Sequence, residues 1–266
     1  MAMIEVCTIS KCYRNVEALK SVTLSIESNS VFGFLGQNGA GKTTLIRILA
    51  GLIKPSSGSC QIDGMGMQRA ERSIGYLAQQ PTFYPWMTGR ELLMFSAKLY
   101  KMDARMLKQR INEVLDLCGI QHAVDRRIGQ YSGGMVQRLG IAQAILHKPK
   151  VVLLDEPASA LDPVGRKEIL TLIGNLREEA TIFMSSHILE DIQRVCNEVA
   201  IIKEGTIILQ EKMGKLLSSH VQTRIHLEFE KAESVGVFQE IVGEFCVGCQ
   251  RESSTSISLS EDEYAN

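Results

Sequence analysis

The sequence predicts an α/β protein with a parallel sheet flanked by helices, an N-terminal antiparallel β subdomain, a helical subdomain and a small C-terminal α+β appendage. Two patterns predict this fold class. Short apolar and polar runs alternate over residues 4–30, which is typical of half-buried antiparallel strands. From residue 151 onward, apolar runs alternate with segments of helical spacing, which favours a parallel sheet covered by helices.

The N-terminal part contains the expected antiparallel strands, followed by a strand, loop and helix. Alternating apolar side chains indicate the strands, at Ile4 and Val6 and at Val22, Leu24 and Ile26. Residues 31–35 are almost entirely apolar and predict a buried strand that leads into a glycine-rich turn. The apolar spacing of residues 44–51 then predicts a helix ended by Gly51, because glycine readily adopts the left-handed conformation found after helices.

Helical spacing continues over residues 88–146, so we expect a helical subdomain there. Beyond this block we expect strands at 151–154, 181–184 and 199–202, and helices at 164–176 and 189–196. The pattern changes after about residue 217, which separates a main domain, 1–217, from an appendage, 218–266. In the appendage we expect a strand at 223–229, a helix at 234–242 and a polar tail that frays at its end.

Composition and charge exclude several classes of protein. Basic and acidic side chains nearly balance, 29 against 30, so the chain lacks the basic footprint of a nucleic-acid binder. Its longest apolar runs are far shorter than the ~20 residues that cross a bilayer. The first residues show neither the basic nor the apolar region of an export signal. We therefore expect a cytoplasmic protein that binds no nucleic acid.

The seven cysteines show no spacing of a disulfide framework, which also favours a reducing cytosol. Cys246 and Cys249 form a C-x-x-C pair, but the sequence supplies no second pair and no nearby histidine to complete a zinc site. We interpret their spacing as incidental.

A glycine-rich motif lies between the predicted strand at 31–35 and the helix behind it. It fits G-x-x-x-x-G-K-[ST], with Gly36, Gln37, Asn38, Gly39, Ala40, Gly41, Lys42 and Thr43, and Thr44 follows. Glycines let the backbone wrap around phosphates, so that N–H groups and the helix N-terminus point at the anion. Lys42 would contact the β- and γ-phosphates, and the Thr43 hydroxyl would bind Mg²⁺. The motif predicts a P-loop NTPase core that binds ATP; a glycine-rich turn without a ligand is the alternative.

Two adjacent carboxylates, Asp155 and Glu156, follow the apolar run at 151–154. Ligands of open α/β sheets collect at the carboxyl ends of strands, and isolated buried acids would be costly there. Asp155 can hold Mg²⁺, whereas Glu156 can polarise the water that attacks the γ-phosphate. Structural acids at a strand end are the alternative reading.

Ser132, Gly133 and Gly134 precede an apolar helical run, so they are expected at a helix N-terminus. The N–H groups there would form a second anion site. Ser-Gly-Gly is also a common turn, so alone it is weak evidence for an anion site. It becomes informative together with the glycine-rich motif and the carboxylate pair.

Together, these segments resemble the nucleotide-binding subunit of ATP-binding-cassette (ABC) transporters, over residues 1 to about 217. The form of residues 131–135 resembles the exporter-type branch of that family. The sequence departs from the commonest family pattern at Tyr131, where leucine is usual, at Met135, where glutamine is usual, and at Ala160, where glycine is usual. None of these departures removes a phosphate donor or a carboxylate.

The resemblance implies roles for four further residues. Tyr13 would stack on adenine, Gln79 would touch Mg²⁺ and the attacking water, and His187 would contact the γ-phosphate. Asp162 belongs to a segment, residues 159–162, that resembles the family's dimer-contact loop. An ordinary structural role is the alternative for Tyr13, Gln79 and His187.

The resemblance also implies two protein partners. In the family, two such domains pack head to tail, so that residues 132–134 of one subunit close over ATP held by the phosphate loop of the other. This chain holds one motif of each kind, so it needs a second copy or a paralogue. The other partner would be an integral membrane permease that holds the protein on the inner face of the cell membrane.

Residues 81–88 are the segment where we expect the permease to dock. The segment is flanked by prolines, which oppose helix, and it carries Phe83, Tyr84, Trp86 and Met87. Such side chains either pack into the core or meet a partner, since interface centres are enriched in aromatics and methionine.

Two other functions are compatible with the motifs. A non-transport cassette ATPase that acts on ribosomes or DNA usually has two cassettes or a long coiled-coil insertion, and this sequence has neither. A regulatory protein that binds ATP without hydrolysing it is expected to lack Glu156 or His187, and both are present. We therefore expect an ATPase that powers transport, with export as the direction.

Overall fold

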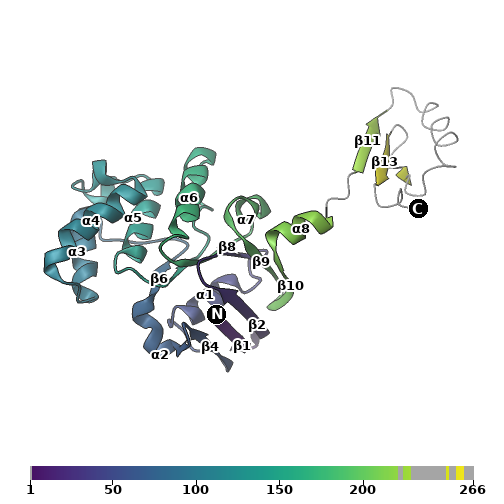
Figure 1. Cartoon of the computed structure of the whole chain (residues 1–266), viewed down its shortest axis with the longest axis horizontal. Coiled ribbons are helices and arrows are strands. Elements are labelled where there is room, and N and C mark those ends of the chain that lie inside the picture. Colours follow the sequence, from purple (N-terminus) through teal and green to yellow (C-terminus); the bar gives the residue numbers. More distant parts are fainter. Residues whose placement is uncertain (1, 221–223, 229–249, 252–255, 261–266) are drawn as a thin grey trace. The chain divides into compact units, whose positions relative to one another are not determined.

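The computed structural model describes residues 2–220, 224–228, 250–251 and 256–260 (Figure 1). The chain divides into a larger unit, Met1–Met213, and a smaller one, Gly214–Asn266. The sequence placed this boundary slightly later, at residue 217. Met213 belongs to the larger unit because its side chain is buried and its N–H donates to the Asn197 carbonyl at 2.8 Å.

An antiparallel sheet forms the β subdomain predicted from the alternating N-terminal pattern. Its strand order is β2-β1-β4-β5, with β1 (Ala2–Tyr13), β2 (Val16–Glu27), β4 (Ser57–Ile62) and β5 (Met65–Gly66). The inward-facing side chains of Ile4 and Ile26 are fully buried, and their sequence neighbours are more exposed. The antiparallel β subdomain is therefore confirmed, and β4 and β5 extend it beyond the predicted range.

The second sheet has six strands in the order β10-β9-β3-β8-β7-β6. They are β3 (Val31–Leu35), β6 (Ile74–Leu77), β7 (Val151–Leu154), β8 (Thr181–Ser186), β9 (Glu198–Lys203) and β10 (Thr206–Lys212). The neighbours from β9 to β6 pair in parallel, as the alternation of strands and helices predicted. The edge strand β10 pairs antiparallel with β9 and was not predicted.

A tight turn at Glu204 and Gly205 explains the direction of β10. Both residues have positive φ, 50° and 82°, which is the backbone of a two-residue hairpin. Gly205 also donates its N–H to the Ala40 carbonyl at 3.0 Å and accepts the N–H of Lys20 at 2.8 Å. The turn therefore contacts both the glycine-rich segment and strand β2.

The predicted helical subdomain contains α3 (Gly89–Leu99), α4 (Ala104–Cys118), α5 (Gly133–Ile145) and two short 3-10 turns, η2 (Gln121–Ala123) and η3 (Ile128–Gln130). Figure 1 shows α3, α4 and α5 grouped together at one side of the larger unit. A capping box between Thr88 and Glu91 begins α3. Asp103 caps α4, and Gly119 ends it with φ of 67°.

The larger unit also contains α1 (Lys42–Leu49), α2 (Met67–Ala70), the 3-10 turn η1 (Glu71–Ser73), α6 (Pro163–Leu176) and α7 (Leu189–Val195). A further helix, α8 (Met213–His220), begins at the last residue of the larger unit and otherwise belongs to the smaller one. The buried face of α1 includes Leu45 and Ile46, and it shares one core cluster with Phe32, Phe34 and Phe183 of the parallel sheet. This packing fixes the strand and the helix on both sides of the glycine-rich turn.

In the smaller unit, β11 (Arg224–Glu228), β12 (Gln250–Arg251) and β13 (Ser256–Ser260) form an antiparallel sheet in the order β11-β13-β12. Strand β11 lies where a strand was expected at 223–229. The helix expected at 234–242 and the pair Cys246 and Cys249 lie outside the described residues. Among the residues that the structure describes, none of the helices combines the length and the apolarity needed to cross a membrane.

A glycine in β6 gives a test of the packing between the sheet and the helical subdomain. A Cβ atom at Gly75 would lie 2.1 Å from the carbonyl oxygen of Ala144 in α5. We expect Gly75→Ala to lower the free energy of unfolding by about 1–3 kcal/mol, because backbone must shift to make room. Gly66→Ala is the control, since that site is open and has φ of −63°. Equal thermal unfolding of the two variants by circular dichroism would contradict the prediction.

Candidate functional site

The predicted site residues meet at the carboxyl edge of the parallel sheet. The glycine-rich segment follows β3, Asp155 and Glu156 follow β7, His187 follows β8, and Gln79 lies just beyond β6. Because these strands are parallel neighbours, their ends lie at one edge, where open α/β sheets bind ligands. The topology therefore brings together segments that are far apart in the chain.

The glycine-rich segment, residues 36–41, wraps from the end of β3 into the start of α1. Gly39 and Gly41 have φ of 82° and 110°, a backbone that other residues rarely adopt. A Cβ at Gly41 would also lie 2.6 Å from the Ala18 carbonyl oxygen, and one at Gly36 would lie 2.6 Å from the Ile202 carbonyl oxygen. Glycine is thus required by both conformation and space, as the motif predicted.

Lys42 is the buried cation of the site, with only 4% of its surface exposed. Its ammonium group donates to the carbonyls of Gly36 at 2.7 Å and Gln37 at 3.1 Å. It also lies 3.0 Å from Oε1 of Glu156, which is similarly buried. All three ammonium donors of Lys42 thus have an oxygen partner.

Glu156 contacts residues from three segments that the sequence analysis identified separately. Its Oε2 lies 2.9 Å from Nδ1 of His187 and 3.4 Å from Nε2 of Gln79, while Oε1 contacts Lys42. Its φ of 45° is left-handed, a strained backbone for a glutamate. The backbone N–H of Glu156 is held by the Ser185 hydroxyl at 2.9 Å. The Glu156 carboxylate is therefore held between Lys42, which contacts Oε1, and His187 and Gln79, which contact Oε2.

Asp155 and Thr43 form the neighbouring oxygen pair, with Thr43 Oγ1 donating to Asp155 Oδ1 at 3.2 Å. Ser185 donates to the same oxygen at 2.8 Å. Burial raises the pKa of the Asp155 carboxyl above its ordinary value, and the hydrogen bonds from Ser185 and Thr43 oppose that shift. Hydroxyl, carboxylate and the Gln79 amide supply the hard oxygen ligands that Mg²⁺ prefers, so these residues fit the cation.

Sequence reasoning missed Ser185, which holds both Asp155 and the Glu156 backbone. Its only signal is its place near the end of an apolar strand beside His187, which also suits an ordinary buried serine.

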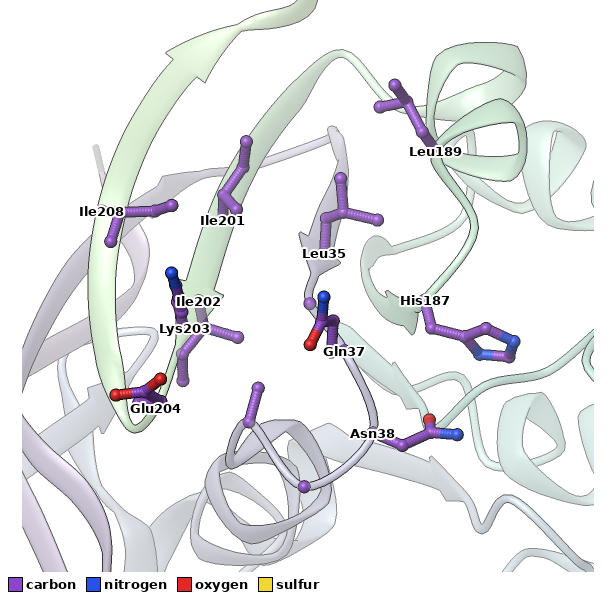
Figure 2. A pocket seen from close by; sticks show the side chains of 13 residues that line it. Leu35, Gln37, Asn38, His187, Leu189, Ile201, Ile202, Lys203, Glu204 and Ile208 are labelled. Atoms are coloured by element: carbon purple, nitrogen blue, oxygen red, sulfur yellow. The ribbon is translucent and has the colours of Figure 1, made fainter.

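Two cavities border the glycine-rich segment. The smaller, of about 300 Å³, is lined by Ala18, Asn38, Gly39, Gly41, Lys42, Thr43, Thr44, Gln79 and Glu156. The larger, of about 470 Å³, includes Gly36, Gln37, Ala40 and His187 and faces β9 and β10 (Figure 2). In Figure 2 its walls carry Leu35, Ile201 and Ile208, so it is largely apolar. Phosphate chemistry therefore fits the smaller cavity, which holds Lys42 and the carboxylate.

Three predicted groups do not join this cluster within one chain. Ser132 accepts the N–H of Met135 at 3.3 Å and caps α5, with Gly133 and Gly134 in the first turn. Asp162 is the N-cap residue of α6. Tyr13 is 45% exposed beneath the ammonium group of Lys11. None of these side chains lines the cavity around Lys42.

Comparison with known proteins identifies the family of the chain. The family model of ABC transporters matches residues 19–159, which include both the glycine-rich motif and the carboxylate pair. The uncharacterised ABC transporter ATP-binding protein YxlF of Bacillus subtilis is 41% identical over 239 residues, 90% of this chain and 80% of that protein. This chain belongs to the ABC transporter family. It has the ABC cassette fold, which confirms the resemblance seen in the sequence.

Further relatives of this ABC protein carry functional names. The bacitracin transport ATP-binding protein BcrA of Bacillus licheniformis is 39% identical over 87% of this chain and 76% of its own length. The linearmycin resistance ATP-binding protein LnrL of Bacillus subtilis is 34% identical over 77% and 68%. The dimeric structure of the cassette MJ0796 bound to ADP and Pi is 25% identical, with a TM-score of 0.72 over 79% of this chain and 99% of that one. The chain is thus an ATP-binding subunit of the ABC class.

Replacing Lys42 tests the assignment of the smaller cavity. We expect Lys42→Ala to weaken ATP binding at least about 100-fold, because a charge-assisted contact to phosphate is lost in the bound ground state. Isothermal titration calorimetry measures the affinity. Lys203→Ala is the control, since Lys203 is exposed and lines only the larger cavity. Unchanged affinity in Lys42→Ala would refute the assignment.

Proposed function

We propose that this ABC subunit hydrolyses MgATP as a head-to-tail dimer and powers export through a separate membrane permease. The observation that carries the proposal is the position of Glu156. Its carboxylate lies between Lys42, Gln79 and His187, beside the Thr43 and Asp155 oxygens. A general base, a phosphate-binding cation and a cation site are the parts that phosphoryl transfer to water needs.

ATP binding would rearrange the partners of Lys42. Its ammonium group now contacts two carbonyls of the loop and Glu156. Phosphate oxygens carry more charge than carbonyls, so the ammonium is expected to turn toward them and to release Oε1 of Glu156. That oxygen would then accept the proton of the attacking water, while His187 holds Oε2 and orients the carboxylate.

Thr43, Asp155 and Gln79 would hold the magnesium ion that accompanies ATP. When bound, Mg²⁺ neutralises the charge that develops on the phosphates. This chain's contribution is to place the Thr43 hydroxyl and the Asp155 carboxylate at neighbouring positions, 3.2 Å apart.

The dimer accounts for the residues that remain outside the cluster. Ser132 and Gly133 are exposed at the N-terminus of α5, and a Cβ at Gly133 would have no atom within 4 Å. An open helix N-terminus can receive an anion, yet in this chain it does not line the cavity around Lys42. A second copy or a paralogue would bring this end to the nucleotide, with Asp162 at the same contact. The structure of the cassette MJ0796, which is dimeric and bound to ADP and Pi, supports a dimer.

Tyr13 is proposed as the adenine contact. Nearly half of its surface is exposed, so part of the side chain is accessible to a planar ligand. Stacking on an aromatic ring typically contributes about 1–3 kcal/mol per base.

The segment at 81–88 supports the proposed permease partner. Tyr84 and Trp86 are 52% and 66% exposed, with ring centroids 5.0 Å apart, whereas Phe83 and Met87 are half-buried. The segment is anchored by hydrogen bonds from Gly129 N–H to the Pro85 carbonyl and from Ile128 N–H to the Met87 carbonyl. A fixed pair of exposed aromatics suits a helix-in-groove contact with a partner.

The names of the relatives support transport, and linearmycin resistance supports export as its direction. They do not favour the alternative of an ATPase acting on ribosomes or DNA. The proposed location is the cytoplasmic side of the cell membrane, where the permease would hold the subunit.

Replacing Glu156 tests hydrolysis and dimerisation together. We expect Glu156→Gln to bind MgATP but to turn it over at least about 100-fold more slowly, because a positioned base typically contributes 10²- to 10⁴-fold. The trapped nucleotide should then hold the dimer closed during gel filtration with MgATP. Glu204→Gln, at an exposed acid of the larger cavity, is the control. Wild-type phosphate release by Glu156→Gln would exclude Glu156 as the base.

Replacing Trp86 tests the permease contact. We expect Trp86→Ala to reduce affinity for the membrane subunit by about 30-fold, since a central aromatic typically contributes about 2 kcal/mol, while ATP binding is retained. Co-purification with the co-expressed permease measures this. Leu52→Ala is the control, because Leu52 is 58% exposed in the turn after α1. Full partner binding and transport by Trp86→Ala would place the docking site elsewhere.

A further inference from the structure

We propose that the ion pair between Arg166 and Asp191 is a positioning pair that fixes His187 and connects it to the loop of residues 159–162. The inference rests on the proposed function, because His187 faces Glu156 there. Neither member of the pair lines the cavity around Lys42, so both would act through the histidine.

The contacts run from the start of α6 to the end of β8. Arg166 Nε donates to Asp191 Oδ1 at 2.6 Å. The other carboxylate oxygen, Oδ2, accepts the Ser186 hydroxyl at 3.3 Å. Asp191 is only 4% exposed, and Ser186 is equally buried, so the hydrogen bond between them is shielded from water. One carboxylate of α7 therefore contacts both α6 and the end of β8.

Ser186 connects Asp191 to the backbone on both sides of His187. Its hydroxyl oxygen accepts the N–H of Ile188 at 3.0 Å and lies 3.2 Å from the Ile188 carbonyl oxygen. The hydrogen bond from Ile188 to Ser186 closes a turn around His187, the residue between the two. The direction of the His187 side chain, which reaches Oε2 of Glu156 at 2.9 Å, thus depends on this turn.

The other end of the pair reaches the 159–162 loop. Arg166 donates its backbone N–H to the Asp162 carbonyl at 2.9 Å. A Cβ at Gly165 would lie 2.8 Å from Asp162 Oδ1, so the glycine leaves space for that carboxylate. At its start, the loop is bound to the Glu156 carbonyl by the Ser159 hydroxyl at 3.1 Å. A displacement of the loop would therefore act on Glu156 directly and on His187 through Arg166.

Three features of this pair oppose fold stability. Nη2 of Arg166 is buried without a hydrogen-bond partner among the residues that the structure describes. A cation near the N-terminus of a helix also interacts unfavourably with the helix dipole. A cavity of about 240 Å³ borders both side chains, so they are not tightly packed. These features oppose stability, whereas a role in placing Ser186 and His187 explains why the charges face each other.

Steady-state kinetics test the pair first. We expect Asp191→Asn to lower kcat at least about 10-fold, as when an orienting partner of a functional histidine is lost, with KM for MgATP within about twofold. Glu190→Gln is the matched control: it removes the same charge from the adjacent residue of α7, which is exposed and borders the same cavity. Wild-type kcat in Asp191→Asn, or an equal loss in both variants, would overturn the inference.

A double-mutant cycle then tests whether the effect passes through the histidine. In a His187→Ala background, Asp191→Asn should cause no further loss of kcat, because the ring that it positions is absent. A further loss of the same size would overturn the inference. If circular dichroism shows that Asp191→Asn does not fold, Arg166→Met replaces it with the same expectations, since that side chain is 27% exposed.

Nuclear magnetic resonance reports on the ring independently of hydrolysis. The imidazole signal that disappears in His187→Ala identifies the residue among the five histidines. We expect this signal to shift in Asp191→Asn and to stay unchanged in Glu190→Gln. An unshifted signal in Asp191→Asn would overturn the inference. Wild-type turnover by His187→Ala would instead refute the proposed role of that histidine, and the imidazole signal would still decide whether the pair positions it.

Discussion

The arrangement of the site depends on the buried ion pair between Lys42 and Glu156. Both side chains are more than nine-tenths buried, and removing a charge from water costs several kcal/mol unless a partner replaces the lost solvation. Two carbonyls of the phosphate loop complete the partners of Lys42, and His187 and Gln79 complete those of Glu156. In the proposed function, a phosphate enters by competing for the ammonium group, so nucleotide binding and release of the carboxylate would be a single exchange.

Local signals predicted much of the fold. The glycine-rich motif could be recognised from its own residues and from the apolar strand before it. The N-terminal strands could be recognised from the alternation of apolar and polar residues alone. The strands β6 and β10 were missed for physical reasons. Strand β6 is short and contains Gly75, which packing against α5 requires. Strand β10 is a half-exposed edge whose direction is set by a turn with positive φ.

The sequence predicted those residues of the candidate site that belong to motifs at the ends of strands. Parallel pairing of β6, β7, β8 and β3 brings Gln79, Glu156, His187 and the phosphate loop to one edge. The predicted alternation of strands and helices implies this for β3, β7 and β8, but not for Gln79, because β6 was missed. Contacts between residues distant in sequence leave no local pattern. The Ser185 bond to Asp155 and the pair of Arg166 with Asp191 are of this kind, because each depends on how two packed elements face each other.

The hairpin turn between β9 and β10 also has a mechanical consequence. Through its two backbone bonds, Gly205 connects the parallel sheet to the phosphate loop at Ala40 and to β2 at Lys20. Backbone hydrogen bonds therefore join the two sheets and the loop into one body. For the proposed transport ATPase, we infer that this body stays fixed during the nucleotide cycle and that the helical subdomain, which contacts it through α5 and β6, moves relative to it.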